Sequence, residues 1–268
     1  MKKIESDIWS NQTAFQGEKI RHDNVNMNHA RDVGSYRELV RLIAELSFNN
    51  SEHVLLYRGQ ELNYVNTSGH SSFYPSIYRN GGKTLKNSEL LSRYSILDSK
   101  SKSLIDIFHA NKIAGWNKLK KHPELAWGIL QHYAICDTPF LDLSHSLRVA
   151  ASFSLLGTSE FGYLYVFGFP HPNGSISYSV DLDLINIRLL SICPPEAQRP
   201  YFQEGYLVGT FPVGRIQKHP SYDIARRLIA KFRLVRKTFW NVDFQPIPYE
   251  ALYPVKDRMY NLCLELNN

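Results

Sequence analysis

The strongest constraint on the fold is a helical pattern that runs directly into a buried strand pattern. From Tyr36, the run YRELVRLIAELSF repeats apolar residues at helical spacing, which predicts an amphipathic helix. Its apolar face holds Leu39, Leu42, Ile43 and Leu46. The following run HVLLYR, residues 53–58, is short and apolar and stops at Gly59, which predicts a buried strand.

The rest of the chain continues this mixture of helices and strands. The same periodicities predict helices at 87–109, 123–133, 146–156 and 248–266, and strands at 163–169, 185–192 and, with a turn inside it, 201–211. The run 221–240 fits either a helix or a strand, and 61–86 is predicted to be a long loop. Interleaved helices and strands predict a mixed α/β or α+β fold.

The chain ends and the composition narrow the class of protein. Residues 1–34 are polar and are predicted to form an arm or edge element, loosely held at its start, before one domain at 35–268. The net charge of +6 fits a partner such as a nucleotide, nucleic acid or acidic protein, although a mildly basic surface without a partner fits equally. No apolar leader or 18-residue apolar run is present, so a soluble cytoplasmic protein is expected.

Cysteines and short motifs exclude several chemistries. Cys136, Cys193 and Cys263 are widely spaced and odd in number, which predicts free thiols in a reducing compartment. Gly82-Lys83-Thr84 resembles the end of a phosphate-binding loop, but Ile77 stands where that loop requires glycine. His132 and Cys136 share a helical spacing, yet two ligands do not make a zinc site, so no metal is expected.

A first candidate site is the strand end Tyr57-Arg58-Gly59. A buried strand that ends on arginine places a guanidinium at the edge of the sheet, where it can bind phosphate or carboxylate in bidentate fashion. Gly59 would let a ligand approach the backbone closely. A structural salt bridge is the simpler explanation for an isolated Arg-Gly pair.

A second candidate begins at Gln131-His132-Tyr133 and continues from Thr138 through Ser144. Asp142 and Ser144 share a face if this segment is extended. Ser144 is also placed to cap the small-residue helix that follows, which would leave backbone N–H groups near an anion. Capping by Asp142 and Ser144, with Tyr133 in the core, explains the same residues without a ligand.

A third candidate is Arg199 followed by Gln203-Glu204-Gly205, a polar pair that enters a predicted strand. An exposed edge strand accounts for it more simply, because strands commonly keep one polar face.

Taken together, these segments resemble the FRG domain, a family named for its aromatic-Arg-Gly strand. The pattern is carried by YRG at 57–59, FYPSIYR at 73–79, QHYAICDTPFLDLSHSLRVAASF at 131–153, RPYFQEG at 199–205 and ALYP at 251–254. The resemblance covers about residues 35–266. The chain departs from the family at Pro139, where arginine is usual, and at Leu143, where tryptophan is usual.

The resemblance implies an α+β fold like that of ADP-ribosyltransferases, with a split sheet, helices packed around it and NAD as substrate. Arg58 would hold an NAD phosphate or ribose, and Ser144 with Asp142 would shape the nicotinamide-ribose pocket. His132 and Tyr133 would stack on or orient the nicotinamide. The full set of implied NAD-binding positions is Tyr57, Gly59, His132, Tyr133, Thr138 and Asp142, beside the catalytic set Arg58, Ser144, Gln203 and Glu204.

The catalytic carboxylate is the position at which the resemblance is least direct. Gln203 stands where the family pattern implies an acid, and on a strand its neighbour Glu204 would point to the opposite face. If Gln203 faces the pocket, the negative charge that stabilises an oxocarbenium-like ribose must come from Asp142 or through a twist near Gly205.

The leading expectation is an NAD-dependent ADP-ribosyltransferase or NAD glycohydrolase, in the role of a bacterial toxin or anti-phage effector, with a protein or nucleic-acid acceptor. The alternative is a non-catalytic module that binds nucleotide or nucleic acid. That alternative rests on Gln203 and on the basic and aromatic run Arg226, Arg227, Lys231, Phe232, Arg233, Arg236, Lys237, Phe239 and Trp240. A solvated helix face is the simpler explanation of the charges in that run.

Overall fold

The computed structural model describes residues 1–10, 19–81, 85–214 and 218–267. The chain forms two compact units, each assembled from three segments. Unit 1 comprises Met1–Phe73, Leu143–Asn173 and Asp223–Tyr249, and unit 2 comprises Tyr74–Asp142, Gly174–Tyr222 and Glu250–Asn268. The Gly82-Lys83-Thr84 motif lies outside the described residues.

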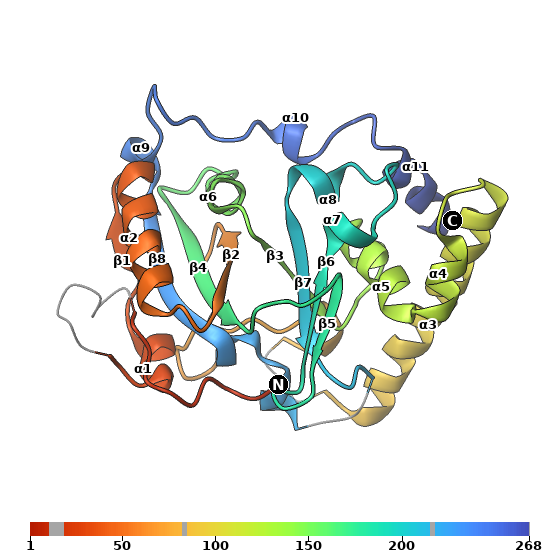
Figure 1. Ribbon diagram of the computed structural model, residues 1–268, viewed down its shortest axis with the longest axis horizontal. Coiled ribbons are helices and arrows are strands. Elements are labelled where there is room, and N and C mark those ends of the chain that lie inside the picture. The colour runs from red at the N-terminus through yellow and green to blue at the C-terminus, as the bar shows by residue number, and fades with distance from the viewer. Residues whose placement is uncertain (11–18, 82–84, 215–217, 268) are drawn as a thin grey trace. The chain divides into compact units, whose positions relative to one another are not determined.

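Unit 1 is a sheet with helices packed on it (Figure 1). Its strands follow the hydrogen-bonded order β1 (Arg31–Val33), β8 (Leu228–Val235), β4 (Phe161–Phe169), β2 (Val54–Gln60) and the end of β3 (Phe140–Ser144). β1 runs parallel to β8, and the other pairs are antiparallel. The helical elements are α1 (His22–Met27), α2 (Tyr36–Asn49), α6 (Leu147–Ser154), the 3₁₀ turn η3 (Ile224–Arg227) and α9 (Arg236–Phe239).

The sequence prediction for α2 is confirmed at both its start and its buried face. The Ser35 side chain accepts a hydrogen bond from the Glu38 backbone N–H, and the Glu38 carboxylate accepts one from Gly34 N–H. Such reciprocal capping satisfies backbone donors that the first helical turn leaves open. The four apolar residues predicted to face the core are all buried: Leu39, Leu42, Ile43 and Leu46.

Helix α6 packs against the bare backbone of β2 and β4 (Figure 1). A Cβ atom at Gly59 would stand 1.8 Å from the Ala150 carbonyl oxygen and 2.7 Å from the Ser154 nitrogen. At Gly162 it would stand 2.2 Å from the Ser154 carbonyl oxygen. The expectation that a ligand approaches Gly59 on this side is therefore wrong, because α6 fills the space.

The N-terminal segment is held by its own apolar side chains. Met1, Ile4 and Ile8 are buried, and the Ile4 N–H donates to the Arg226 carbonyl at 3.1 Å. At the end of this segment, β1 lies at the edge of the strand order, beside β8. The expectation of a loosely held start is wrong for residues 1–10, because apolar residues three and four positions apart anchor a segment whose overall composition is polar.

Unit 2 combines a smaller run of strands with most of the long helices. The order is the start of β3, then β7 (Gly205–Thr210), β6 (Leu184–Arg188) and β5 (Ile176–Ser179), with β5, β6 and β7 antiparallel. The helices are α3 (Asn87–Ala110), α4 (Trp116–Lys121), α5 (Pro123–His132), α7 (Leu189–Ile192), α8 (Arg199–Phe202) and α11 (Arg258–Leu264), with α10 (Tyr249–Leu252) beginning at the last residue of unit 1. The 3₁₀ turns are η1 (Ser76–Tyr78), η2 (His219–Tyr222) and η4 (Glu265–Asn267).

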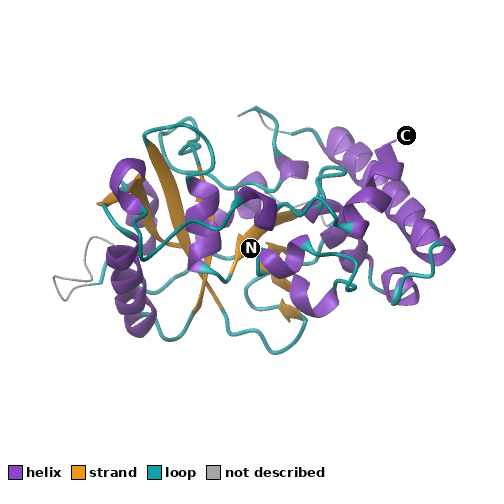
Figure 2. Ribbon diagram, turned by 90° about the horizontal axis from the view of Figure 1, so that it is seen from above, coloured by secondary structure: helices purple, strands orange, loops and turns teal. Residues whose placement is uncertain are grey.

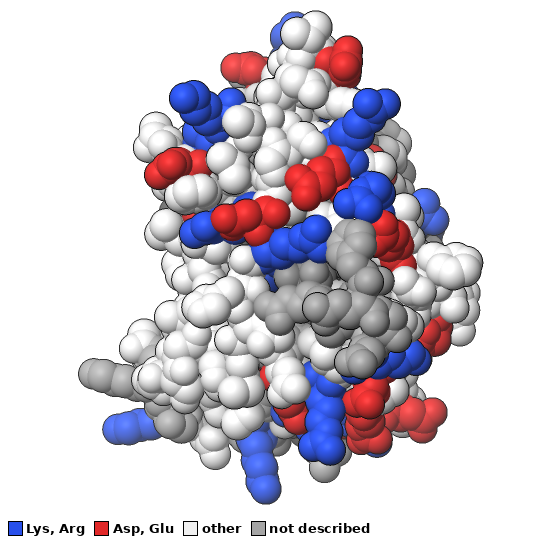
Figure 3. All heavy atoms as spheres, turned by 90° about the vertical axis from the view of Figure 1, so that its left-hand side faces the viewer, with Lys and Arg blue, Asp and Glu red and all other residues white. Residues whose placement is uncertain are grey.

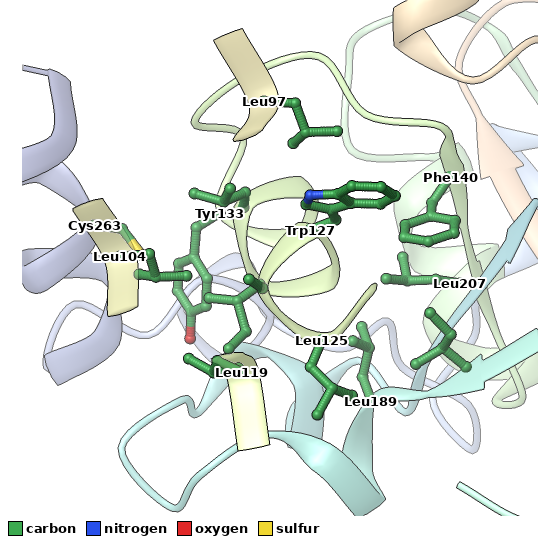
Figure 4. Packing of buried hydrophobic residues seen from close by; sticks show 14 of the residues in the cluster. Leu97, Leu104, Leu119, Leu125, Trp127, Tyr133, Phe140, Leu189, Leu207 and Cys263 are labelled. Atoms are coloured by element: carbon green, nitrogen blue, oxygen red, sulfur yellow. The ribbon is translucent and has the colours of Figure 1, made fainter. Parts of the chain in front are cut away.

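The core of unit 2 lies between these helices and strands. Helices α3, α4 and α5 pack against one another (Figure 2). Leu97 from α3, Trp127 from α5, Phe140 from β3 and Leu207 from β7 meet in one buried cluster, which Tyr133 also enters (Figure 4). Core packing thus fixes α5 and Tyr133, the residue that directly follows it.

The predicted mixed α+β class is confirmed, and three segments differ in detail. The predicted strand at 185–192 is β6 followed by α7, and the predicted strand–turn–strand at 201–211 is α8 followed by β7. Pro200 lies in the first turn of α8, where proline favours a helix start, so the aromatic pair after it is helical and not extended. The ambiguous run 221–240 consists of 3₁₀ turns, β8 and α9.

Two further properties concern the cysteines and the lengths of the helices. Cys136, Cys193 and Cys263 are free thiols, as predicted, and burial raises the pKa of Cys136 to about 11 and of Cys263 to about 12. In the part of the chain that the structure describes, no helix combines the length and apolarity needed to cross a membrane.

We expect Gly59→Ala to destabilise unit 1 by about 3 kcal/mol or more, because the added methyl group would collide with helix backbone that cannot move alone. Gly34→Ala is the matched control, since its Cβ would meet only the Thr238 hydroxyl, at 3.7 Å. Denaturant titration of both variants measures the difference. Equal stabilities of the two variants would contradict the packing of α6 on β2.

The buried His22 makes the packing of the N-terminal segment sensitive to acid. His22 is 6% exposed, and burial lowers its pKa from 6.5 to about 4, with the nearby Arg227 guanidinium adding to the effect. The folded pKa lies below the unfolded one, so the unfolded state binds more protons between pH 6.5 and 4. Stability therefore falls as the pH drops through this window.

From this shift, we expect the free energy of unfolding to fall by up to about 3 kcal/mol between neutral pH and pH values below 4. His22→Leu should flatten that part of the stability curve. His171→Leu, at an exposed histidine of the same unit, should leave the slope unchanged. Denaturation measured at a series of pH values tests this, and an unchanged slope in His22→Leu would refute it.

Candidate functional site

The ten candidate residues divide between the two units. Unit 1 contains Tyr57, Arg58, Gly59 and Ser144. Unit 2 contains His132, Tyr133, Thr138, Asp142, Gln203 and Glu204.

In unit 1, strand pairing sends Arg58 and Ser144 to opposite faces of the sheet. Tyr57 lies directly opposite Ser144 in the antiparallel pair, so these two side chains share a face. Arg58 is next along β2 and therefore points to the other face, opposite Tyr165 of β4, which in turn lies opposite Lys231 of β8. Burial raises the pKa of Tyr57 to about 12.

Ser144 does not cap the following helix. Its hydroxyl oxygen accepts a hydrogen bond from the Ser146 N–H at 3.0 Å, and Ser146 is the residue that caps α6 through the Val149 N–H. The predicted capping role of Ser144 is wrong because β3 stays extended through this residue and the chain needs two more residues to turn.

Lys231 adds a buried cation to the face that carries the half-buried Arg58. Lys231 is 5% exposed, and its ammonium donates to the Asn26 carbonyl at 3.1 Å and to the Ser71 hydroxyl at 3.3 Å. Burial lowers the pKa of Lys231 to about 8. The hydroxyl of Tyr165, between the two cations in the register, donates to Asn63 at 2.9 Å.

In unit 2, a chain of polar contacts runs from the loop before α3 to β3. The Thr138 N–H donates to the Ser76 hydroxyl at 2.9 Å, and the Thr138 hydroxyl donates to the Gln131 side-chain carbonyl. The Gln131 amide donates to Asp142 Oδ2 at 2.6 Å. His132 Nδ1 lies 3.5 Å from Asp142 Oδ1, an electrostatic contact longer than a normal hydrogen bond. Gln131 and His132 thus both contact the Asp142 carboxylate.

Burial separates the roles of the members of this chain. Thr138 has no exposed surface and orients Gln131, so it does not face a ligand. The His132 side chain is 4% exposed, whereas that of Asp142 is 36% exposed. His132 Nε2 is buried and has no hydrogen-bond partner among the described residues, a state that a water molecule or a ligand atom normally relieves.

Gln203 and Glu204 lie in a turn between α8 and β7, so the prediction that they alternate on a strand is wrong. Gln203 ends α8, and its amide donates to the Leu252 carbonyl at 2.8 Å. Glu204 is exposed and has a φ of 45°, in the left-handed region that few residues other than glycine adopt. This conformation reverses the chain direction at Glu204 and starts β7 at Gly205.

Gly205 brings this turn against His132. A Cβ atom at Gly205 would stand 3.5 Å from His132 Cε1 and 2.9 Å from Leu189 Cδ1. The QHY and RPYFQEG segments, about 70 residues apart in the chain, are therefore in contact within unit 2.

Tyr133 is an anchor of this arrangement. Its hydroxyl donates to Asp257 Oδ2 at 2.7 Å, its ring lies in the core (Figure 4), and burial raises its pKa far above the usual range. The Arg199 N–H donates to the same Asp257 oxygen at 3.1 Å. With 3% of its surface exposed, Tyr133 does not present a ring for nicotinamide, so that expectation is wrong.

The Arg199 guanidinium is enclosed by aromatic rings. It lies 4.3 Å from the ring centre of Tyr260, 5.2 Å from that of Tyr133 and 5.3 Å from that of Tyr253. Cation–π contacts of this kind fix a guanidinium without a carboxylate partner. Asp257, which the sequence analysis missed, caps α11, and its signal is an aspartate directly before an apolar helical run.

Basic side chains of the run 226–237 form hydrogen bonds with other residues of unit 1. Arg227 donates to the Gly168 carbonyl at 2.8 Å, and Arg236 donates to the carbonyls of Ser159 and Leu155. The expectation of a solvated helix face is wrong, because residues 228–235 form strand β8.

The aromatic residues of this run are not free for base stacking. Phe232 and Phe239 have no exposed surface, so the stacking prediction is wrong for both rings. Trp240 stacks on Tyr36 at 5.3 Å between ring centres. Figure 3 shows acidic and basic side chains interspersed on the face that it draws, without a large patch of one sign.

Comparisons with family models, with curated proteins and with solved structures found no match to this chain. Across the described ranges, no group of three or more His, Cys, Asp or Glu side chains is arranged to hold a metal ion.

We expect Tyr133→Phe to destabilise the protein by about 1–3 kcal/mol, because it removes a donor from the fully buried Asp257 carboxylate. Tyr201→Phe is the control, since Tyr201 lies in the same unit and is 43% exposed. Thermal and denaturant unfolding compare the two. Equal, small effects would show that Tyr133 is not an anchor.

Proposed function

We propose that this chain binds NAD and breaks its nicotinamide–ribose bond, passing the ADP-ribosyl group to an acceptor or to water. The observation that carries the proposal is the meeting, within unit 2, of segments on which the family resemblance rests. Gln131 contacts Asp142, His132 contacts the Gly205 region, and Gln203 bonds to Leu252 of the ALYP segment. Contacts in one unit thus join motifs that the sequence only places in order.

The succession of elements also supports the proposal. A strand bearing Arg58 comes first, then a strand ending at Ser144 and the small-residue helix α6. The turn of Gln203 and Glu204 follows later and leads into β7. This is the order that the resemblance to ADP-ribosyltransferases implies.

In the proposed reaction, the protein acts by stabilising charges on NAD and forms no covalent bond with it. Breaking the bond between ribose C1′ and nicotinamide leaves the electron pair on the nicotinamide nitrogen, which becomes neutral, while positive charge develops on the ribose. Water or an acceptor then bonds to C1′ and releases a proton. Fixed negative charge beside the ribose and fixed positive charge beside the pyrophosphate lower the barrier.

The residues for these tasks are assigned within each unit. Unit 2 offers the carboxylates of Asp142 and Glu204 and the buried His132 imidazole, which can accept or donate a hydrogen bond at Nε2. In unit 1, Arg58 is the residue that the resemblance assigns to phosphate or ribose. With the reaction we also propose a cytoplasmic location, which three free thiols support, and the role of a toxin or anti-phage effector.

The test is nicotinamide release from NAD by the purified protein, with and without cell extract as a source of acceptor. We expect Arg58→Ala to lower kcat/KM by at least about tenfold, the usual effect of losing one charge-assisted hydrogen bond. Arg188→Ala, which removes an exposed arginine at the end of β6, should leave it unchanged.

Release that is equal in wild type and Arg58→Ala would remove Arg58 from the site. Binding of NAD without release by the wild type would favour the alternative, a non-catalytic nucleotide-binding module. Neither binding nor release would overturn the proposed function.

A further inference from the structure

Resting on the proposed function, we propose that Asp142 is the carboxylate that stabilises the positive ribose, with Gln131 and His132 as its positioning residues. The family pattern implies an acid where this chain has Gln203. A neutral amide can hold a hydroxyl group but supplies no negative charge. Another carboxylate must therefore provide it.

Two polar side chains of unit 2, Gln203 and Asp257, already form hydrogen bonds with other groups. The Gln203 amide donates to the Leu252 carbonyl, so the side chain is turned towards the ALYP segment. Asp257 has no exposed surface and accepts hydrogen bonds from Tyr133, from the Arg199 N–H and from the first turn of α11. Asp257 thus cannot reach a ligand without dismantling the core around it.

The remaining choice is between Glu204 and Asp142. Glu204 is exposed, and a charge surrounded by water is screened and must be ordered again in each turnover. Asp142 is partly buried: Oδ1, which faces His132 at 3.5 Å, is enclosed, Oδ2 accepts from Gln131 at 2.6 Å, and 36% of the side chain is exposed. Asp142 therefore combines fixed orientation with access.

The supporting residues are themselves fixed. Thr138, held by Ser76, donates to Gln131 and determines which end of the Gln131 amide faces Asp142. The His132 ring is confined beside Gly205, so its Nδ1 edge stays turned to the carboxylate. Orientation of a reacting group by such partners is common in catalytic and metal sites.

In the proposed step, Asp142 forms no covalent bond. The C1′–nitrogen bond breaks, nicotinamide leaves with the electron pair, and the Asp142 carboxylate offsets the charge on C1′ and the ring oxygen. The attacking water or acceptor supplies the new bond at C1′, and its proton passes to solvent. The reaction consumes only NAD and this nucleophile.

Asp142→Asn is the sharpest variant because it removes charge at nearly constant shape. The new amide can still accept from Gln131 through its oxygen and donate to His132 Nδ1 through its nitrogen. We expect kcat for nicotinamide release to fall by about 100-fold or more, as when a fixed charge or donor is lost from a transition state. The KM for NAD should change by less than about threefold.

Asp106→Asn, at an exposed carboxylate of α3 in the same unit, is the matched control and should retain kcat within about threefold. Glu204→Gln tests the competing carboxylate. Gln131→Met tests the positioning role, since methionine keeps the length and loses the donor. It should lower kcat by about tenfold, with KM for NAD and the melting temperature nearly unchanged. A changed KM or a lowered melting temperature without a fall in kcat would mean that Gln131 has only a structural role.

Each outcome bears on the inference. Wild-type release that persists in Asp142→Asn would overturn it and leave the proposed function standing. A large loss in Glu204→Gln with a small one in Asp142→Asn would transfer the role to Glu204. Absence of release and of NAD binding by the wild type would overturn the proposed function and this inference together.

Discussion

The arrangement of unit 2 depends on one buried carboxylate. Asp257 has no exposed surface, and it joins the hydroxyl of Tyr133, the backbone of Arg199 and the first turn of α11. A buried charge is stable only when donors surround it, so each of these segments is fixed by the needs of the others. The segment that ends in Tyr133 also carries Gln131 and His132, and the candidate site takes its position from this anchor.

The polar side chains around this anchor have two roles: some are buried and hold the structure together, and others are exposed to solvent. Thr138 and Tyr133 are enclosed and serve the architecture, while Asp142 is held from behind and still meets solvent. His132 stands between these groups, with one ring nitrogen turned to Asp142 and the other buried without a partner among the described residues. Such division is typical of sites in which a rigid shell orients one reactive group.

The sequence predicted those parts of the fold that depend on local periodicity. The face of α2 and the existence of β2 follow from spacing, because one buried side is enough to define each. The predicted end of the strand at Arg58 is wrong, because β2 continues through Gly59 to Gln60 in its pairing with β4. Gly59 was assigned to a ligand, since sequence cannot tell which neighbour fills the space of a missing Cβ. Glu204 was placed on a strand, because a left-handed glutamate turn has no signal in composition. The contacts of Asp257 were missed because they join distant segments.

The most direct test of the proposed site is whether NAD binds beside Gln131, His132 and Asp142 in unit 2. Histidine-labelled protein, titrated with NAD and followed by NMR, reports on the His132 imidazole, whose signals are assigned by their loss in His132→Gln. We expect a saturable shift of the His132 signals, with those of the exposed His171 of unit 1 unchanged. His132 signals that stay fixed throughout the titration would contradict it, because the proposed site would then have no NAD to act on.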